Sequence, residues 1–280
     1  MTVSPGDAMT AVRQMVERRA LWTGFRPADI PVAIYDGRTT WLFSHPNPPG
    51  AFKPLSDSVS IHDGLHETVR ANTACLVGDV WTATFMSLAQ SGSIEEAASI
   101  VIHEMFHVFQ ISKHQNWWTN EADRFMYPVF DEEALCLRRL ETRMLRAALS
   151  AVEVAESMRY AKAALGFRKT RYGLVGAKPA EYERGMERIE GLAQYIEDLS
   201  LRRTDPRIPD EGYSPDEVRR RCYAVGAAWA RLLDRHSDGW VAEFDRRENA
   251  PALDTTLDGK LGASTVPRDP APDLVRAERV

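Results

Sequence analysis

The chain has 280 residues, 44% hydrophobic and 27% charged, so it can bury a sizeable core and is not a disordered protein. Its 35 Lys and Arg stand against 40 Asp and Glu. The net charge of −5, without a concentrated basic tract, argues against a nucleic-acid or anionic-membrane binder. Three widely spaced cysteines without a CxxC motif exclude a disulfide scaffold, and no apolar run approaches the ~18 residues that cross a bilayer. Because the first residues also lack a signal-peptide pattern, we expect a cytoplasmic protein with reduced thiols.

The N-terminal part of the chain alternates between short β-rich runs and turn signals. Apolar residues at helical spacing first predict a helix within residues 1–24. The runs VAIY and TTWLF flank an Asp-Gly pair and predict a hairpin, and ANTACLV and VWTATFMSL predict a second strand pair. Residues 44–58, between the two pairs, are so rich in proline that we expect a loop. The β-rich part thus covers residues 30–90.

From Ser93 onward the pattern is helical. Ser93 and Glu96 form a capping box that opens a helix predicted over 93–114, and the Ala/Leu/Arg/Glu-rich stretch 130–165 predicts one long helix or two. We expect two further helices, at 179–203 and 214–236, because each range has a proline near its first turn. A tail rich in Pro and Asp is expected at 251–280.

Strands followed by helices predict an α+β fold that is mostly α-helical. We expect a small antiparallel or mixed sheet in the N-terminal half and a helical C-terminal half. The sequence shows no internal repeat and no interdomain linker, so residues 1–250 are predicted to form a single domain.

The clearest chemical signal is the segment HEMFH inside the helix predicted over 93–114. His103 and His107 are four residues apart, so both imidazoles project from one helical face and can bind one metal ion. Glu104 lies on a neighbouring face, within reach of a water on that ion. Because the surrounding residues are apolar, this helix is expected to be buried, and a zinc ion would satisfy its polar side chains.

A catalytic zinc needs a third protein ligand and an open position. By residue type, the other histidines and many carboxylates are candidates; these histidines are His45, His62, His66, His114 and His236. One segment is more specific, since Glu190 opens the sequence EGLAQYIE.

HExxH followed by this segment resembles the gluzincin metallopeptidases, especially those similar to the aminopeptidase N group. The resemblance implies that Glu190 is the third zinc ligand and that the sheet packs on the pair of helices carrying the ligands. Gly191 and Ala193 are expected to let the second of these helices approach the histidine helix closely. Glu197, two turns after Glu190, is expected to orient a zinc-bound imidazole.

The spacing differs from that of the family, because 82 residues separate His107 from Glu190. We therefore expect an inserted helical region at 121–185. Acidic residues closer to the histidines remain alternative ligands: Glu121, in a TNEAD segment that resembles the ligand region of thermolysin-like enzymes, and Glu132 or Glu133.

Two weaker features resemble the same family. Tyr223 opens a Tyr-x-x-Gly segment, and the resemblance implies that its hydroxyl stabilises the oxyanion of the reaction. Asn72 and Ala74 open a predicted strand about 30 residues before the histidines, where gluzincins bind peptides along a sheet edge. The Gly-Ala-Met-Glu-Asn sequence that anchors a substrate amino terminus is lacking, so aminopeptidase specificity is not implied.

These features predict a zinc hydrolase with one Zn2+ per chain, in which Glu104 is the general base acting on a peptide or a small amide-containing substrate. Two alternatives stay open. One is a zinc enzyme with non-peptide or biosynthetic chemistry on the same scaffold, and the other is a catalytically inactive zinc-binding scaffold protein.

Overall fold

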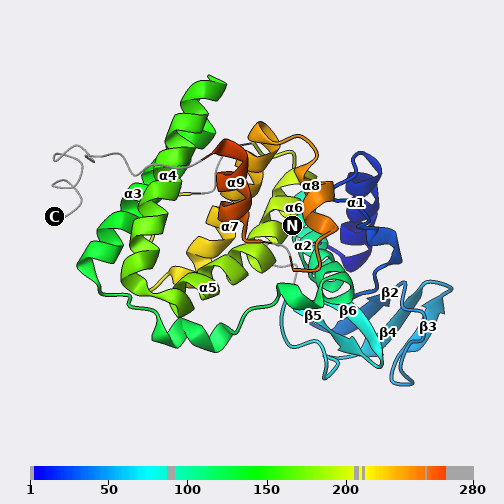
Figure 1. Cartoon of the computed structure of the whole chain (residues 1–280). Coiled ribbons are helices and arrows are strands. Elements are labelled where there is room, and N and C mark those ends of the chain that lie inside the picture. Colours follow the sequence, from blue (N-terminus) through cyan, green and yellow to red (C-terminus); the bar gives the residue numbers. More distant parts are fainter. Residues whose placement is uncertain (1–2, 87–91, 205–207, 210–211, 250, 263–280) are drawn as a thin grey trace. The chain divides into compact units, whose positions relative to one another are not determined.

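The structure is a computed structural model that describes residues 3–86, 92–204, 208–209, 212–249 and 251–262. It is an α+β fold with one mixed sheet in the N-terminal half and helices after it, so the expected class is confirmed (Figure 1). By its internal contacts the chain divides into two compact units. The first comprises residues 1–115 and 196–203, and the second comprises residues 116–195 and 204–280. The single domain expected over 1–250 stays a prediction.

The first unit contains a six-stranded sheet with the strand order β3-β4-β2-β1-β6-β5. β1 (Val32–Tyr35) pairs antiparallel with β2 (Thr39–Phe43), which forms the hairpin expected around the Asp-Gly pair. β1 also pairs in parallel with β6 (Val80–Phe85), and β6 pairs antiparallel with β5 (Thr73–Val77). β5 therefore lies at an edge of the sheet.

The opposite edge of the sheet was not predicted. β3 (Lys53–Ser56) and β4 (Val59–Asp63) form an antiparallel pair, so the loop expected over 44–58 is wrong for the residues of β3. Pro54 is tolerated in β3 because an edge strand does not need every N–H for pairing. The pairing register of β3 with β4 shifts between Pro54 and Ser56. All four residues of β3 are exposed, so no alternation of apolar residues marked the strand.

In the first unit, α2 (Ile94–Lys113) packs on the sheet and α1 (Pro5–Glu17) packs on α2. α1 ends well before the last residue of the expected range 1–24, and a short 3-10 turn, η1 (Pro27–Asp29), follows it. α2 matches the predicted helix, and the Ser93 hydroxyl accepts a hydrogen bond from the Glu96 amide at 3.1 Å. α2 packs against α1, β5 and β6, and residues 101–110 of the helix are all buried.

The second unit is helical. The range 130–165 forms two helices, separated at residues 151–153, and the helix predicted over 179–203 is a continuous stretch in which a π-helical turn, η4, joins α5 to α6. The last residues of α6 belong to the first unit. The elements are η2 (Gln115–Trp117), η3 (Glu121–Met126), α3 (Glu132–Ser150), α4 (Val154–Val175), α5 (Ala177–Met186), η4 (Glu187–Gly191), α6 (Leu192–Ser200), α7 (Val218–His236), α8 (Trp240–Asp245) and α9 (Leu253–Leu261).

Two further differences from the predictions lie in the C-terminal helices. α7 begins four residues later than expected, because Glu217 is its N-cap and the carboxylate of Glu217 accepts a hydrogen bond from the Ser214 amide. α9 lies within the expected tail 251–280, so that prediction is wrong for its residues; its leucines recur at helical spacing and are buried. The part of the tail from 263 to 280 lies outside the described residues.

Two glycines bring the backbones of η4 and α7 into contact. A Cβ atom on Gly191 would lie 2.5 Å from the Gly226 Cα, and a Cβ on Gly226 would lie 2.7 Å from the Gly191 Cα. Real Cβ atoms do not approach that closely, so only glycine fits at both positions. The close approach that Gly191 permits is thus to α7, whereas the sequence suggested the histidine helix.

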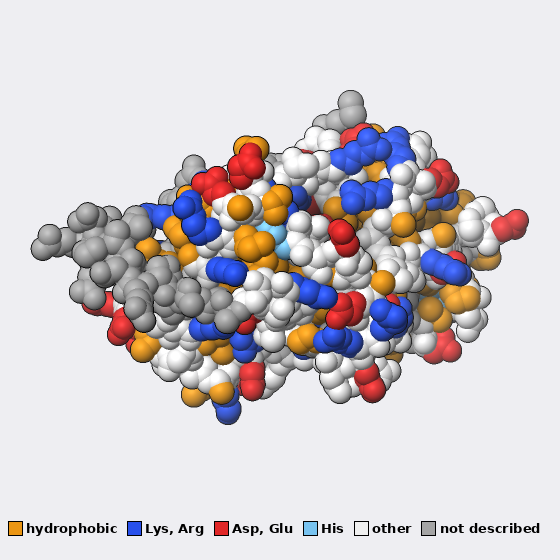
Figure 2. Space-filling view, turned by 45° about the horizontal axis from the view of Figure 1, so that its top comes forward, with side chains coloured by type: hydrophobic (Ala, Val, Ile, Leu, Met, Phe, Trp, Pro, Cys, Tyr) orange, Lys and Arg blue, Asp and Glu red, His pale blue; other side chains and the backbone are white. Residues whose placement is uncertain are grey.

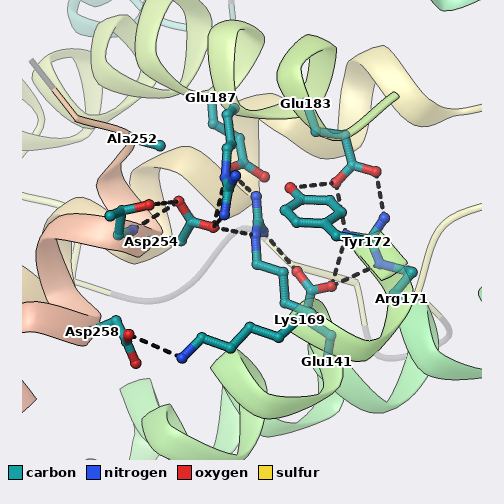
Figure 3. A network of polar contacts seen from close by, with 12 residues as sticks. Glu141, Lys169, Arg171, Tyr172, Glu183, Glu187, Ala252, Asp254 and Asp258 are labelled. Carbon is teal, nitrogen blue, oxygen red and sulfur yellow. Dashed lines mark hydrogen bonds and ion pairs between the residues drawn. The ribbon is translucent and has the colours of Figure 1, made fainter. Parts of the chain in front are cut away.

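A buried ionic network connects the helices of the second unit (Figure 3). Three guanidinium groups and four carboxyl groups, all at most 4% exposed, take part: Glu141, Arg168, Arg171, Glu183, Glu187, Arg221 and Asp254. They come from α3, α4, α5, η4, α7 and α9, so most helices of the unit contribute a charge. Buried charges of this kind are tolerated only when each one is paired.

The four carboxyl groups of the network are not equivalent. Burial raises the pKa of Glu141, but Arg171, Arg221 and Arg168 outweigh burial and lower that pKa to about 2. Burial dominates at Glu187 and raises its pKa to about 7, although Arg168 opposes the shift. Glu187 therefore carries a proton over part of the neutral pH range.

We expect Gly226→Ala to destabilise the chain by about 1–3 kcal/mol or more, because the new methyl group would force η4 and α7 apart. Urea unfolding followed by circular dichroism measures the change. Gly173→Ala, in α4, is the matched control: nothing lies within 4 Å of its added Cβ, and alanine is the better helix former. Equal destabilisation by both substitutions would contradict the assigned backbone contact.

We expect Glu141→Gln to cost about 3–5 kcal/mol of unfolding free energy at pH 7, because it leaves buried guanidinium charge unpaired. Glu187→Gln should cost no more than about 1 kcal/mol, since a neutral amide replaces a carboxyl that is already partly protonated. The same urea titration compares the two isosteric changes. A larger loss for Glu187→Gln would show that the proton is held elsewhere in the network.

Candidate metal centre

Both histidines of the HEMFH segment are buried on α2 and are held through the same ring atom. Nδ1 of His103 lies 3.2 Å from Oε2 of Glu197, and Nδ1 of His107 lies 2.8 Å from Oε1 of Gln110. A carboxylate or amide oxygen can only accept, so in a neutral imidazole each Nδ1 carries the proton and Nε2 carries the lone pair. This is the tautomer that binds a metal through Nε2, with the outer hydrogen bond fixing the ring.

The contact of Glu197 with His103 agrees with the expected role of orienting an imidazole, and that role stays a prediction. Glu197 lies near the end of α6 and contacts the first histidine of the pair, whereas Gln110 supports the second histidine from within α2 itself. The two imidazole rings are 4.9 Å apart between centroids. Glu104, the next residue after His103, is also buried, at 7% exposure.

Glu190 lies on the π-helical turn η4 and is buried. Its Oε1 accepts a hydrogen bond of 2.8 Å from Nη2 of Arg219, which comes from α7. Glu190 and Glu197 belong to one continuous helical stretch, and seven residues are close to two helical turns. The two carboxylates therefore project from similar faces of that stretch, and one of them already contacts His103.

His103, His107 and Glu190 form a group of potential ligands that could hold a metal ion, and all three residues are buried. Two imidazole nitrogens and one carboxylate oxygen form a donor set that suits zinc and leaves a coordination position for water. The chemistry of these donors, together with the hydrogen bonds on Nδ1, therefore fits a catalytic zinc site.

The alternative ligands lie elsewhere. Glu121 is 62% exposed, with Oε2 3.6 Å from Nε of Arg219, and Glu132 and Glu133 are exposed in the first turn of α3. Within the described ranges, none of the three belongs to a group of potential metal ligands. The remaining histidines are likewise outside the group, and this includes the neighbouring pair formed by His62 and His66.

Tyr223 lies on α7, half-buried, with its ring 5.5 Å from the guanidinium carbon of Arg219. Both residues line a cavity of about 550 Å³, together with Gln194 and Tyr213. A volume of this size is within the range of small-molecule pockets. Tyr223 thus borders a cavity instead of filling the core, and its catalytic role stays a prediction.

Asn72 directly precedes the edge strand β5, and Ala74 is the second residue of that strand. The Asn72 side chain accepts a hydrogen bond of 3.0 Å from the Met86 amide, so it joins the strand to the residue after β6. Among the described strands, β5 pairs only with β6, and an edge strand offers backbone groups to an extended peptide. The geometry agrees with the expected type of strand, while substrate binding by these residues stays a prediction.

The sequence analysis missed Gln110 and Arg219. Gln110 follows His107 by three residues, so helical spacing alone could have indicated their contact. No local signal pointed to Arg219, because its contact with Glu190 joins two different helices across 29 residues of chain.

No family model, curated protein or solved structure matches this chain. The resemblance to gluzincins therefore rests on the sequence motifs and stays a prediction. In the part of the chain that the structure describes, no helix has both the length and the apolar character needed to span a membrane. On the face shown in Figure 2, acidic and basic side chains are interspersed, which is typical of an ordinary solvated surface.

We expect the wild-type chain to bind about one zinc ion, and Glu190→Ala to weaken binding strongly because it removes one of three ligands. Glu121→Ala and Glu132→Ala are matched controls that remove a carboxylate outside the group and should leave the affinity nearly unchanged. Metal analysis after dialysis and titration against a zinc chelator measure both quantities. If Glu121→Ala or Glu132→Ala lost more zinc affinity than Glu190→Ala, Glu190 would not be the third ligand.

Proposed function

We propose that this chain is a zinc-dependent hydrolase that cleaves peptide or amide bonds, with His103, His107 and Glu190 as the zinc ligands. The observation that carries the proposal is the combination of the buried three-donor group with acceptors on both histidine Nδ1 atoms. A buried pair of imidazoles beside carboxylates is costly without a cation, whereas a zinc ion uses every one of these donors.

When bound, zinc would lower the pKa of a water ligand to about 7 and polarise the substrate carbonyl. Glu104 accepts a proton from the attacking water and returns it to the leaving nitrogen, so that water and the amide become an acid and an amine. The position of Glu104 supports this role, because it is buried directly beside a ligand on the same helix. A purely structural zinc site has no use for such a base.

Tyr223 and β5 have supporting roles in the proposal. The Tyr223 hydroxyl donates to the oxyanion that develops on the carbonyl oxygen, a contribution of about 3 kcal/mol for a well-placed donor. The edge strand β5 binds an extended substrate through backbone hydrogen bonds. The substrate class is accordingly a peptide or a small molecule with an amide bond.

We expect Glu104→Gln to retain zinc with near wild-type affinity and to lose turnover by about 10²–10⁴-fold, because the amide cannot accept and return a proton. Cleavage of a peptide library by the zinc-loaded protein identifies the substrate, and kcat is then measured on that substrate. Glu95→Gln makes the same chemical change on the exposed first turn of α2 and should turn over at the wild-type rate.

Wild-type turnover by Glu104→Gln would eliminate water activation by this carboxylate. Absence of cleavage by a wild-type chain that binds zinc would instead favour the scaffold alternative.

A further inference from the structure

We propose that Arg219 is a positioning residue of the zinc site, which holds the carboxylate of Glu190 and the ring of Tyr223 in one arrangement. This inference rests on the proposed function, in which Glu190 is a zinc ligand and Tyr223 an oxyanion donor. All three residues belong to the same compact unit.

The guanidinium group of Arg219 contacts both partners with different surfaces. Its Nη2 donates to Oε1 of Glu190 at 2.8 Å, and its carbon lies 5.5 Å from the centroid of the Tyr223 ring. Its Nε also lies 3.6 Å from Oε2 of the exposed Glu121. An arginine guanidinium keeps its charge across the pH range in which proteins fold. A planar guanidinium can donate at its edge and stack with its face, and a lysine ammonium cannot do both.

The packing of α7 explains why Arg219 reaches Glu190. Arg219, Tyr223 and Gly226 follow one another at intervals of four and three residues, so they lie on one face of the helix. Gly226 brings that face against the backbone of η4, and Glu190 is the residue directly before Gly191 at the contact. The same helix contact therefore delivers the guanidinium to the carboxylate.

Two opposing effects follow for a metal bound by Glu190. The hydrogen bond fixes one carboxylate oxygen, so the other can bind a metal with little loss of side-chain entropy. The positive charge of Arg219, in contrast, repels a divalent cation. Because the Arg219 side chain is 38% exposed, water screens this repulsion, whereas the direct hydrogen bond is retained. We therefore expect the positioning of Glu190 to affect zinc affinity more than the repulsion does.

The test measures zinc affinity by chelator competition, and cobalt(II) absorption as a readout of coordination geometry, on the full chain. We expect Arg219→Ala to bind zinc about 10–100-fold more weakly and to alter the cobalt spectrum. Arg219→Lys, which keeps one donor and the charge, should recover part of the affinity. Arg220→Ala is the matched control, because the neighbouring Arg220 is 73% exposed and pairs with Glu217; it should behave like the wild type.

Unchanged or tighter zinc binding by Arg219→Ala, in a wild type that binds zinc, would overturn this inference and leave the proposed function standing. A wild type that takes up no zinc would overturn both. Thermal unfolding of the zinc-free variants separates positioning from a general loss of fold. Should Arg219→Ala fail to fold, Arg219→Lys decides: wild-type affinity together with a wild-type cobalt spectrum would overturn the inference.

Discussion

The backbone contact between Gly191 and Gly226 is the constraint on which the helical unit depends. It sets the distance between η4 and α7, and thereby the reach of every side chain that crosses from one helix to the other. Arg219 contacts Glu190 across this interface, and Glu187, whose backbone also touches Gly226, continues into the ionic network. A separation larger by the size of one methyl group would lengthen the contact between Arg219 and Glu190 beyond hydrogen-bond distance.

In the candidate metal centre, a further polar side chain supports each of the three donors. His103 is held by Glu197, His107 by Gln110 and Glu190 by Arg219, so one polar side chain orients each potential ligand. Outer hydrogen bonds of this kind reduce the freedom that a ligand loses on binding. The supporting side chains come from α6, α2 and α7, so only one of them lies on the helix that carries the HEMFH segment.

Local signals in the sequence predicted most of the fold. The Asp-Gly turn, the Ser93 capping box and the apolar stripe of α2 act over a few residues and were placed correctly. β3 was missed because an exposed edge strand has no apolar alternation, and α9 was missed although its leucines have helical spacing. In the site, spacing identified the histidine pair and a family resemblance identified Glu190. Arg219 could not be predicted, since its contact depends on how two helices pack.

The raised pKa of Glu187 in the ionic network couples folding to the proton concentration. In an unfolded chain the Glu187 carboxyl has its ordinary pKa of 4.5, and in the folded chain that pKa is about 7. Folding near pH 6 therefore takes up about one proton at this position. The stabilisation that comes from this uptake is fully present below pH 4.5 and is lost as the pH rises through 7. The helical unit therefore binds a proton at Glu187 when it folds. Alkaline solution, which removes that proton, lowers the stability of the unit.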